Sequence, residues 1–426
     1  MSLPFAVARR NQLVTVAMVF AVFTGFAFVL PFLPLYVAEL GVRDPHQAAL
    51  WAGVLIGVGP LVAGLVAPVW GRLADRHGHK RIALTALAAC VVMLLLSAGA
   101  GRVEQLFALR LGIGLFGGIG PLGLAMATAQ APRQETGRAV GLVQAAQILS
   151  AAVGPMAGGV LADSIGMRRT FVATAGLCAL AWLLVLALYR ERRREPASHP
   201  EAAGSFAAVV AVPGVAALLA VLFLVNFIGR SFTPILPLHL AELGVAHARL
   251  ASGTGLLISV YAVAASASAA ALGRLSRKRS PSRLLLLTLA GGALAVLPMA
   301  LATRLAHMFA LALLLGLVSG GSLTLCYTIG GLMVPEHVRT TAFGFFSGAA
   351  LFGGAVSPSV AGLLLHLSLR AIYWVDGVLY LALAGMMATG GLLSGSSRPA
   401  PQQPDSQPLA SQLPGGCGGQ EPPASK

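Results

Sequence analysis

The sequence predicts an all-α membrane protein of twelve transmembrane helices, built as two copies of a six-helix unit. Only 10% of its 426 residues are charged and 57% are hydrophobic, whereas about 25% of a soluble globular protein is charged. Apolar runs of about 20 residues, long enough to cross a bilayer core of about 30 Å, recur from end to end. The runs are continuous rather than alternating, which favours helices over a barrel.

The elements follow in order from these runs. The first span is predicted at 12–36, directly after Arg9 and Arg10, and it is too long for the apolar core of a signal peptide. Further spans are predicted at 48–70, 82–100, 103–129, 139–162, 170–189, from 208 onward, and at 252–272, 284–303, 306–333, 341–366 and 371–394. The chain thus divides into an N-terminus (1–11), a first bundle (12–189), a polar, basic linker (190–207), a second bundle (208–394) and a tail (395–426). The tail, rich in Pro, Gln, Ser and Gly, is expected to be disordered.

The two bundles are predicted to be copies of one unit because the sequence repeats. The stretch 31–42, PFLPLYVAELGV, returns at 234–245 as PILPLHLAELGV, with nine of twelve positions identical. An offset of 202 or 203 residues also relates Gly71-Arg-Leu to Gly273-Arg-Leu, and Pro155 to Pro358. Parallel halves related by an axis along the membrane normal are an architecture of secondary transporters.

The net charge of +15 reflects orientation in a membrane. With a cytoplasmic N-terminus and twelve spans, 20 of the 29 Lys and Arg residues lie on the inner side and 7 on the outer side, while Arg110 and Arg230 lie within spans. This asymmetry follows the positive-inside rule. We therefore expect cytoplasmic termini and a lipid bilayer as the partner, and we exclude nucleic-acid binding.

A short basic stretch, Gly71–Arg81, separates the second and third spans. It reads GRLADRHGHKR and meets every fixed position of the pattern GxLADRxGxKR. We expect a loop in which Gly71 and Gly78 permit tight turning and Asp75 faces the positive end of a helix. The chain resembles the major facilitator superfamily, whose signature loop lies here. The resemblance implies a latch that joins the two halves in the outward-open state, formed by Gly71, Asp75, Arg76, Gly78, Lys80 and Arg81.

The fifth span carries a second motif, made of Gly141, Ser150, Gly154, Pro155, Gly158 and Gly159. It resembles the antiporter motif of the same superfamily, with Ser150 in place of one glycine. Ser150, Gly154 and Gly158 are spaced by four residues, so they are predicted to form one small-residue face on which another helix packs. The resemblance implies proton-driven export rather than import.

Three charged residues lie within predicted spans, where a charge is costly and often marks a pathway. Arg110 begins Arg-x-x-x-Gly in span 4, and the resemblance implies a role in proton transfer or substrate contact; bonding to backbone carbonyls across helices is the structural alternative. Arg230 and Asp376 either line the path or reach the interface by snorkelling. Five further residues either contact substrate or tie helices together: Gln144, Gln147, Asn226, Tyr261 and Tyr327.

The sequence therefore favours a secondary transporter over an enzyme, since no nucleotide-binding or hydrolase motif is present. The likeness is to the twelve-span drug:proton antiporters, among them bacterial multidrug exporters of the MdtG type, and covers about residues 12–394. This resemblance implies export by alternating access across the plasma membrane, which is expected to be a bacterial inner membrane. Two positive residues and few acids in the spans favour neutral or anionic lipophilic substrates over cations. We expect a monomer with no metal or cofactor, the proton being the coupling ion. The alternatives are an importer or uniporter of a small metabolite, and a non-transporting scaffold or sensor.

Overall fold

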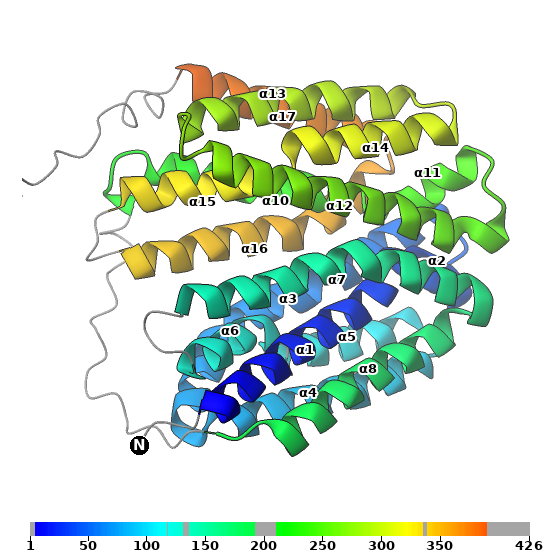
Figure 1. The fold of residues 1–426 in the computed structure, drawn as a ribbon. Coiled ribbons are helices and arrows are strands. Elements are labelled where there is room, and N and C mark those ends of the chain that lie inside the picture. The colour runs from blue at the N-terminus through cyan, green and yellow to red at the C-terminus, as the bar shows by residue number, and fades with distance from the viewer. Residues whose placement is uncertain (1–4, 117, 131–135, 192–209, 335–338, 390–426) are drawn as a thin grey trace, which may run out of the picture.

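The structure, a computed structural model, describes residues 5–116, 118–130, 136–191, 210–334 and 339–389, and the regular elements in them are helices (Figure 1). The first half contains α1 (Phe5–Val29), η1 (Leu30–Phe32), α2 (Leu33–Glu39), α3 (Pro45–His77), α4 (His79–Ala98), α5 (Val103–Phe116), α6 (Ile119–Gln130), α7 (Thr136–Ile165) and α8 (Met167–Leu188). The second half contains α10 (Val215–Ser231), α11 (Leu236–Glu242), η3 (His247–Arg249), α12 (Leu250–Leu275), α13 (Pro281–Val296), η4 (Leu297–Leu301), α14 (Leu305–Ser319), α15 (Ser322–Met333), α16 (Arg339–Leu364) and α17 (Ala371–Thr389).

The number of membrane-spanning helices agrees with the sequence prediction. Within the described residues, eleven helices are long and apolar enough to cross a membrane, or twelve if the bent pair α10–α11 counts as one span. The spans run from Val7–Glu39 to Ala371–Thr389. The chain is therefore an all-α, multi-pass membrane protein.

Four spans, the first, fourth, seventh and tenth, each contain two α-helices where the sequence predicted single runs. In the first, Pro31 and Pro34 lie in η1 and α2; in the seventh, Pro234 and Pro237 lie in and just after the break between α10 and α11, where the axis bends by 42°. Proline causes such breaks because it lacks a backbone donor. A glycine pair, Gly320–Gly321, separates α14 from α15. The broken spans are therefore every third span along the chain, beginning with the first.

The N-terminus and the Gly71–Arg81 stretch differ from their predicted forms. Residues 5–11, predicted to precede the first span, already belong to α1. The predicted loop is largely helical, because α3 continues to His77 and α4 begins at His79. The turn is confined to Gly78, whose φ of 93° suits a residue without a Cβ. Gly71 therefore lies inside a helix and makes no turn.

Each half has its own apolar core. In the first half α1 packs on α7 and α8, and α4 on α8; in the second, α10 packs on α16 and α13 on α17. Separate clusters of buried residues fill the two halves, one centred on residues such as Phe32, Leu87 and Phe171, the other on residues such as Leu285 and Phe346. Most of the predicted linker (190–207) and the whole predicted tail (395–426) lie outside the described residues, so their boundaries stay predictions.

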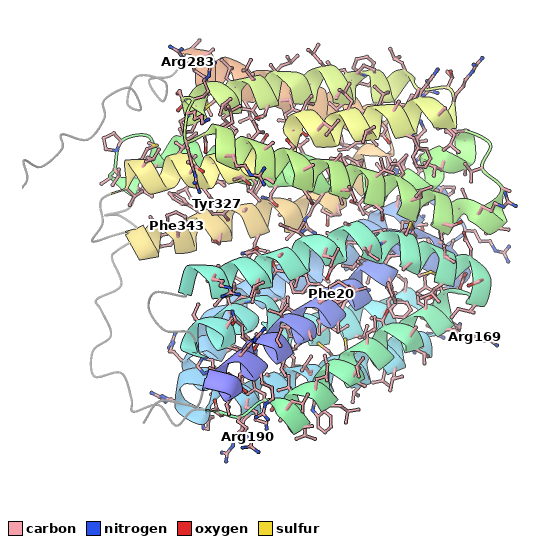
Figure 2. All side chains as sticks on the ribbon, viewed as in Figure 1. Phe20, Arg169, Arg190, Arg283, Tyr327 and Phe343 are labelled. Carbon is pink, nitrogen blue, oxygen red and sulfur yellow. The ribbon has the colours of Figure 1, made fainter. Side chains whose placement is uncertain are left out.

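The halves meet along two seams, α7 against α12 and α3 against α16. Arg190 and Arg283 lie toward one end of the bundle, and Arg169 lies toward the opposite end (Figure 2). We call the first the basic end. We call the opposite end, which holds α2, α11 and η3, the far end (Figure 1). These two ends provide the reference for the site.

Candidate functional site

The crevice between the halves is closed at the far end. Along the α7–α12 seam, a Cβ added to Gly159 would overlap the carbonyl oxygen of Ala251, and one added to Gly255 would overlap that of Pro155. Along the α3–α16 seam, Gly53 stands in the same way against the backbone of Pro358. Backbones this close leave no passage, because only glycine permits such an approach.

The same helix faces are open toward the basic end. Gly141 precedes Gly159 on α7 by about five helical turns, and Gly344 precedes Gly362 on α16 by the same spacing, so each pair shares one face. Gly362 touches Leu50 in the other half, whereas a Cβ added to Gly141 or Gly344 would meet nothing within 4 Å. Among the described residues, the two halves are therefore in close contact at the far end and separate toward the basic end.

Polar contacts between the halves strengthen the closed end. Asp163, near the end of α7, accepts hydrogen bonds from Ser252 N (2.7 Å) and Ala251 N (3.2 Å) at the start of α12. The Ser252 hydroxyl also donates to this carboxylate, at 2.5 Å. Free backbone N–H groups and the helix dipole both favour a negative charge at this position. Asp163 therefore acts as a cap that one half places on a helix of the other.

The second seam closes with different chemistry. His366 lies 203 residues after Asp163, at the equivalent position of the repeat. Its ring stacks on that of His46 in the first turn of α3, with centroids 5.3 Å apart and planes inclined by 16°. Pseudosymmetric seams thus end in an ionic cap on one side and an aromatic pair on the other.

Several of the polar residues singled out in the sequence lie on helices of the crevice, in both halves. The exposed Arg230 and half-buried Asn226 of α10 lie against Gly354 of α16, with Arg230 Cδ 3.0 Å from the position of an added Cβ. Gln144 of α7 is exposed, and Gln147, one turn further on, lies near Gly120 of α6. These side chains give the crevice hydrogen-bond donors and one cation.

Aromatic rings add apolar surface to the second half. Tyr327 stacks on Phe343, with centroids 6.0 Å apart, and its hydroxyl donates to Ser347 at 3.4 Å. Both rings lie toward the basic end (Figure 2). Tyr261 packs edge to face with Phe232, just beyond the end of α10, at 6.0 Å. The surroundings combine flat apolar faces with few polar groups, as ligand sites do.

Arg110 and Asp376 lie elsewhere, inside the two bundles. Arg110 is 3% exposed, its guanidinium carbon is 5.9 Å from the centre of the Phe171 ring, and two of its nitrogens have no hydrogen-bond partner. Asp376 is completely buried in the second half and contacts Ser231. Neither residue snorkels to an interface, and neither is exposed to the crevice in this conformation.

The small residues of the span 5 motif serve two interfaces. Ser150 bonds Thr24 Oγ1 and Phe20 O of α1, each at 3.0 Å, and Gly154 and Gly158 approach the same helix at Ala27 and Phe28. This is the close packing that the four-residue spacing predicts. Pro155 and Gly159, on another side of α7, instead meet α12 across the seam. One motif therefore holds α7 to its own half and brings it against the other.

The Gly71–Arg81 stretch is fixed to the end of α8. Lys80 Nζ donates to the carbonyls of Leu186 (2.8 Å) and Tyr189 (2.7 Å), and Glu191 accepts from Lys80 N at 3.3 Å. A cation at the end of α8 and an acid at the start of α4 both match the helix dipoles. Arg76 and Arg81 are exposed. The side chain of Asp75 lies outside the described part, so its latch role stays a prediction.

Sequence reasoning missed Asp163, Glu191 and the His46–His366 pair. A signal for Asp163 was available, since an acid follows Gly159 by one turn at the end of span 5. The partners of that acid include two backbone amides, however, and every residue except proline carries such a group, so the sequence does not show which ones will be bonded. Glu191 and the two histidines had no pattern to point to them.

The fold and the crevice define a membrane protein built to open a central path to one side at a time, which is the architecture of a secondary transporter. The family model of the Major Facilitator Superfamily matches residues 15–303 and 218–414. The chain is 31% identical over 385 residues to multidrug resistance protein MdtG of Serratia proteamaculans, covering 88% of this chain and 92% of that one. MdtG of Proteus mirabilis is 29% identical over 354 residues, covering 82% and 88%.

A solved structure shares the fold. The bacterial homolog of the human lysosomal transporter Spinster, in an inward-facing and unoccupied conformation, aligns with a TM-score of 0.77 at 18% identity, covering 93% of this chain and all of that one. With the family match over most of the chain, these findings settle the class. The protein belongs to the Major Facilitator Superfamily and is a secondary transporter, not an enzyme.

Proposed function

We propose that this protein exports lipophilic drugs or metabolites from the cytoplasm in exchange for protons. The direction rests on the span 5 motif, which resembles the antiporter motif of proton-driven exporters and in the structure packs α7 against α1 and α12. The similarity to proteins named multidrug resistance protein supports the same direction. By the positive-inside rule the basic end faces the cytoplasm, in a bacterial inner membrane, and the conformation is inward-facing.

We further propose neutral or anionic substrates. Arg230 is exposed at the crevice, whereas Asp376, the acid that could have balanced it, is buried inside the second half. Tyr261 and Tyr327 supply aromatic surface, and Gln147 and Asn226 supply polar contacts. A cavity with a positive charge and apolar walls favours such compounds by charge and by burial. Because the crevice is complete within one chain, we take the monomer as the working unit.

Cellular accumulation tests the proposal. In efflux-deficient bacteria expressing the chain, we expect lower accumulation of some members of a panel of neutral, anionic and cationic lipophilic dyes. Adding a protonophore should raise dye accumulation again, and so should the Asp75→Asn substitution. Accumulation that rises instead would identify an importer, and a spectrum limited to quaternary cations would refute the substrate class.

A further inference from the structure

Three titratable side chains lie at the far end of the second half. The residues at the equivalent positions of the first half are neither acids nor bases that titrate near neutral pH. His239, Tyr373 and Asp376 stand where the repeat places Tyr36, Phe171 and Thr174, at the offset of 202 or 203 residues. Geometry confirms the equivalence: the Tyr36 and Phe171 ring centroids are 5.0 Å apart, and those of His239 and Tyr373 are 5.4 Å apart. His239 Nδ1 lies 3.0 Å from the Tyr373 hydroxyl. All three are buried.

The first half shows what packing alone requires at the Asp376 position. There, Thr174 Oγ1 donates to the carbonyl of Gly25 on α1 at 3.0 Å. In the second half the equivalent carbonyl, that of Ile228 on α10, accepts from Ser231 Oγ at 2.9 Å, and Ser231 in turn contacts Asp376 Oδ2. A neutral hydroxyl is therefore enough to join the two helices of the first half. In the second half the carbonyl of Ile228 is bonded within its own helix, so the hydrogen bond between α10 and α17 is that of Ser231 with Asp376.

The surroundings of Asp376 favour its neutral form. The Ser231 hydroxyl carries one hydrogen and lies within hydrogen-bonding distance of both Ile228 O and Asp376 Oδ2, so it can donate to either. Asp376 is 0% exposed, and the ion pair found among the described residues, His79–Glu191, lies far from it in the other half. A buried carboxylate without a cation would be strongly unfavourable.

Asp376 also lies beside a break in a membrane-spanning helix pair. Its partner Ser231 is the last residue of α10, directly before the 42° bend to α11. Discontinuous membrane helices are where transporters place ion sites. Two polar atoms in this cluster, Asp376 Oδ1 and His239 Nε2, have no hydrogen-bond partner in the structure. A change in the bend would separate Ser231 from Asp376 and admit water from the far end.

We propose that Asp376 binds the coupling proton, with Ser231 at the break of span 7 and the His239–Tyr373 pair beside it; this rests on the proposed proton-coupled export. In the outward-open state a proton from water at the far end forms an O–H bond on the Asp376 carboxylate. The closed far end of this structure holds it there. The same bond breaks, and the proton passes to water of the crevice, in the later step that loads substrate.

The charged and titratable groups around the site make this exchange selective. Arg230 directly precedes Ser231 in α10 and lies against α16. A substrate that contacts Arg230 in the crevice is therefore one residue away from the contact between Ser231 and the proton site. Near Asp376, the other such groups on the packed elements are His239 of α11, Tyr261 of α12, Tyr373 and Tyr380 of α17, and the exposed Arg370 just before α17. The acid of α11, Glu242, is exposed, so Asp376 is the buried acid of this group.

Two substitutions test the site in the full-length protein. Asp376→Asn removes the titratable group and keeps the shape, and Asp376→Thr installs the residue of the first half. In proteoliposomes loaded with a lipophilic dye that the wild type exports, we expect both to lose transport driven by a pH gradient by about tenfold or more. Dye exchange at equal pH on both sides should persist. Glu104→Gln, at an exposed acid of the far end, is the control and should match the wild type.

Infrared difference spectroscopy of the purified proteins gives a readout that does not depend on transport. The wild type should show a carboxylic-acid C=O band that shifts in D2O and disappears in both Asp376 variants. Gradient-driven transport that survives in Asp376→Asn, or an unchanged band, would overturn the assignment while leaving proton-coupled export intact. If no gradient drives the wild type, the proposed coupling fails, and this inference fails with it.

Discussion

At the scale of single residues, a few polar groups control which side of the protein is open. Asp163 is the clearest case, because its carboxylate bonds two backbone amides and a hydroxyl of the opposite half. These bonds exist only while the far end is closed. The energy of the cap therefore belongs to one conformation rather than to the fold.

We predict that Asp163→Ala shifts the protein toward the outward-open conformation. Hydrogen bonds to a charged group are worth about 1.5–3 kcal/mol, so the ratio of the two conformations should change by about tenfold or more. Spin labels at the exposed, repeat-related Glu39 and Glu242 would report longer far-end distances. Glu104→Gln should leave the distances unchanged. An unaltered distribution in Asp163→Ala would show that the glycine seams alone hold the end closed.

At the scale of the element, the glycines of α7 lie in three different environments. Gly158 meets the backbone of Phe28 within its own half, Gly159 meets Ala251 across the seam, and Gly141 meets nothing. The motif looks uniform in the sequence. The structure separates its members by what lies opposite each one.

We predict three distinct outcomes for alanine at these positions. Gly158→Ala should lower the melting temperature, since its Cβ would overlap α1. Gly159→Ala should leave the first half folded but open the far end, as spin labels would detect. Gly141→Ala should keep the wild-type melting temperature, because its Cβ meets nothing and alanine favours the helix. Equal losses of melting temperature in all three variants would contradict this division.

At the scale of the whole molecule, two six-helix halves with separate cores meet along two seams of closely approaching backbone. Separate cores allow each half to move as a body, while the seams form at one end in this conformation. The described core residues end at Met387. Transport should therefore depend on residues before that position.

We predict that a chain truncated after Gly395 still exports. The tail that follows is polar and is expected to add nothing to either core. Accumulation in efflux-deficient cells, compared at equal protein level with the full chain, checks this. Lost activity in a stably inserted truncation would favour the scaffold or sensor alternative, in which the tail acts on a partner.

Sequence alone determined the class, the number of spans and the twofold repeat, because bilayer thickness and hydrophobicity act on local stretches of chain. It also found the α7 face that packs on α1, since helical spacing is local. The breaks in spans 1 and 7 were within reach, as their prolines were visible.

Only the tertiary structure decided which end is closed, that Asp163 caps α12, and that Arg230 faces the crevice while Asp376 is buried with Ser231. These facts depend on contacts between residues far apart in the chain, often with backbone groups. Every residue carries such groups, so no pattern of side chains marks the ones that will be used.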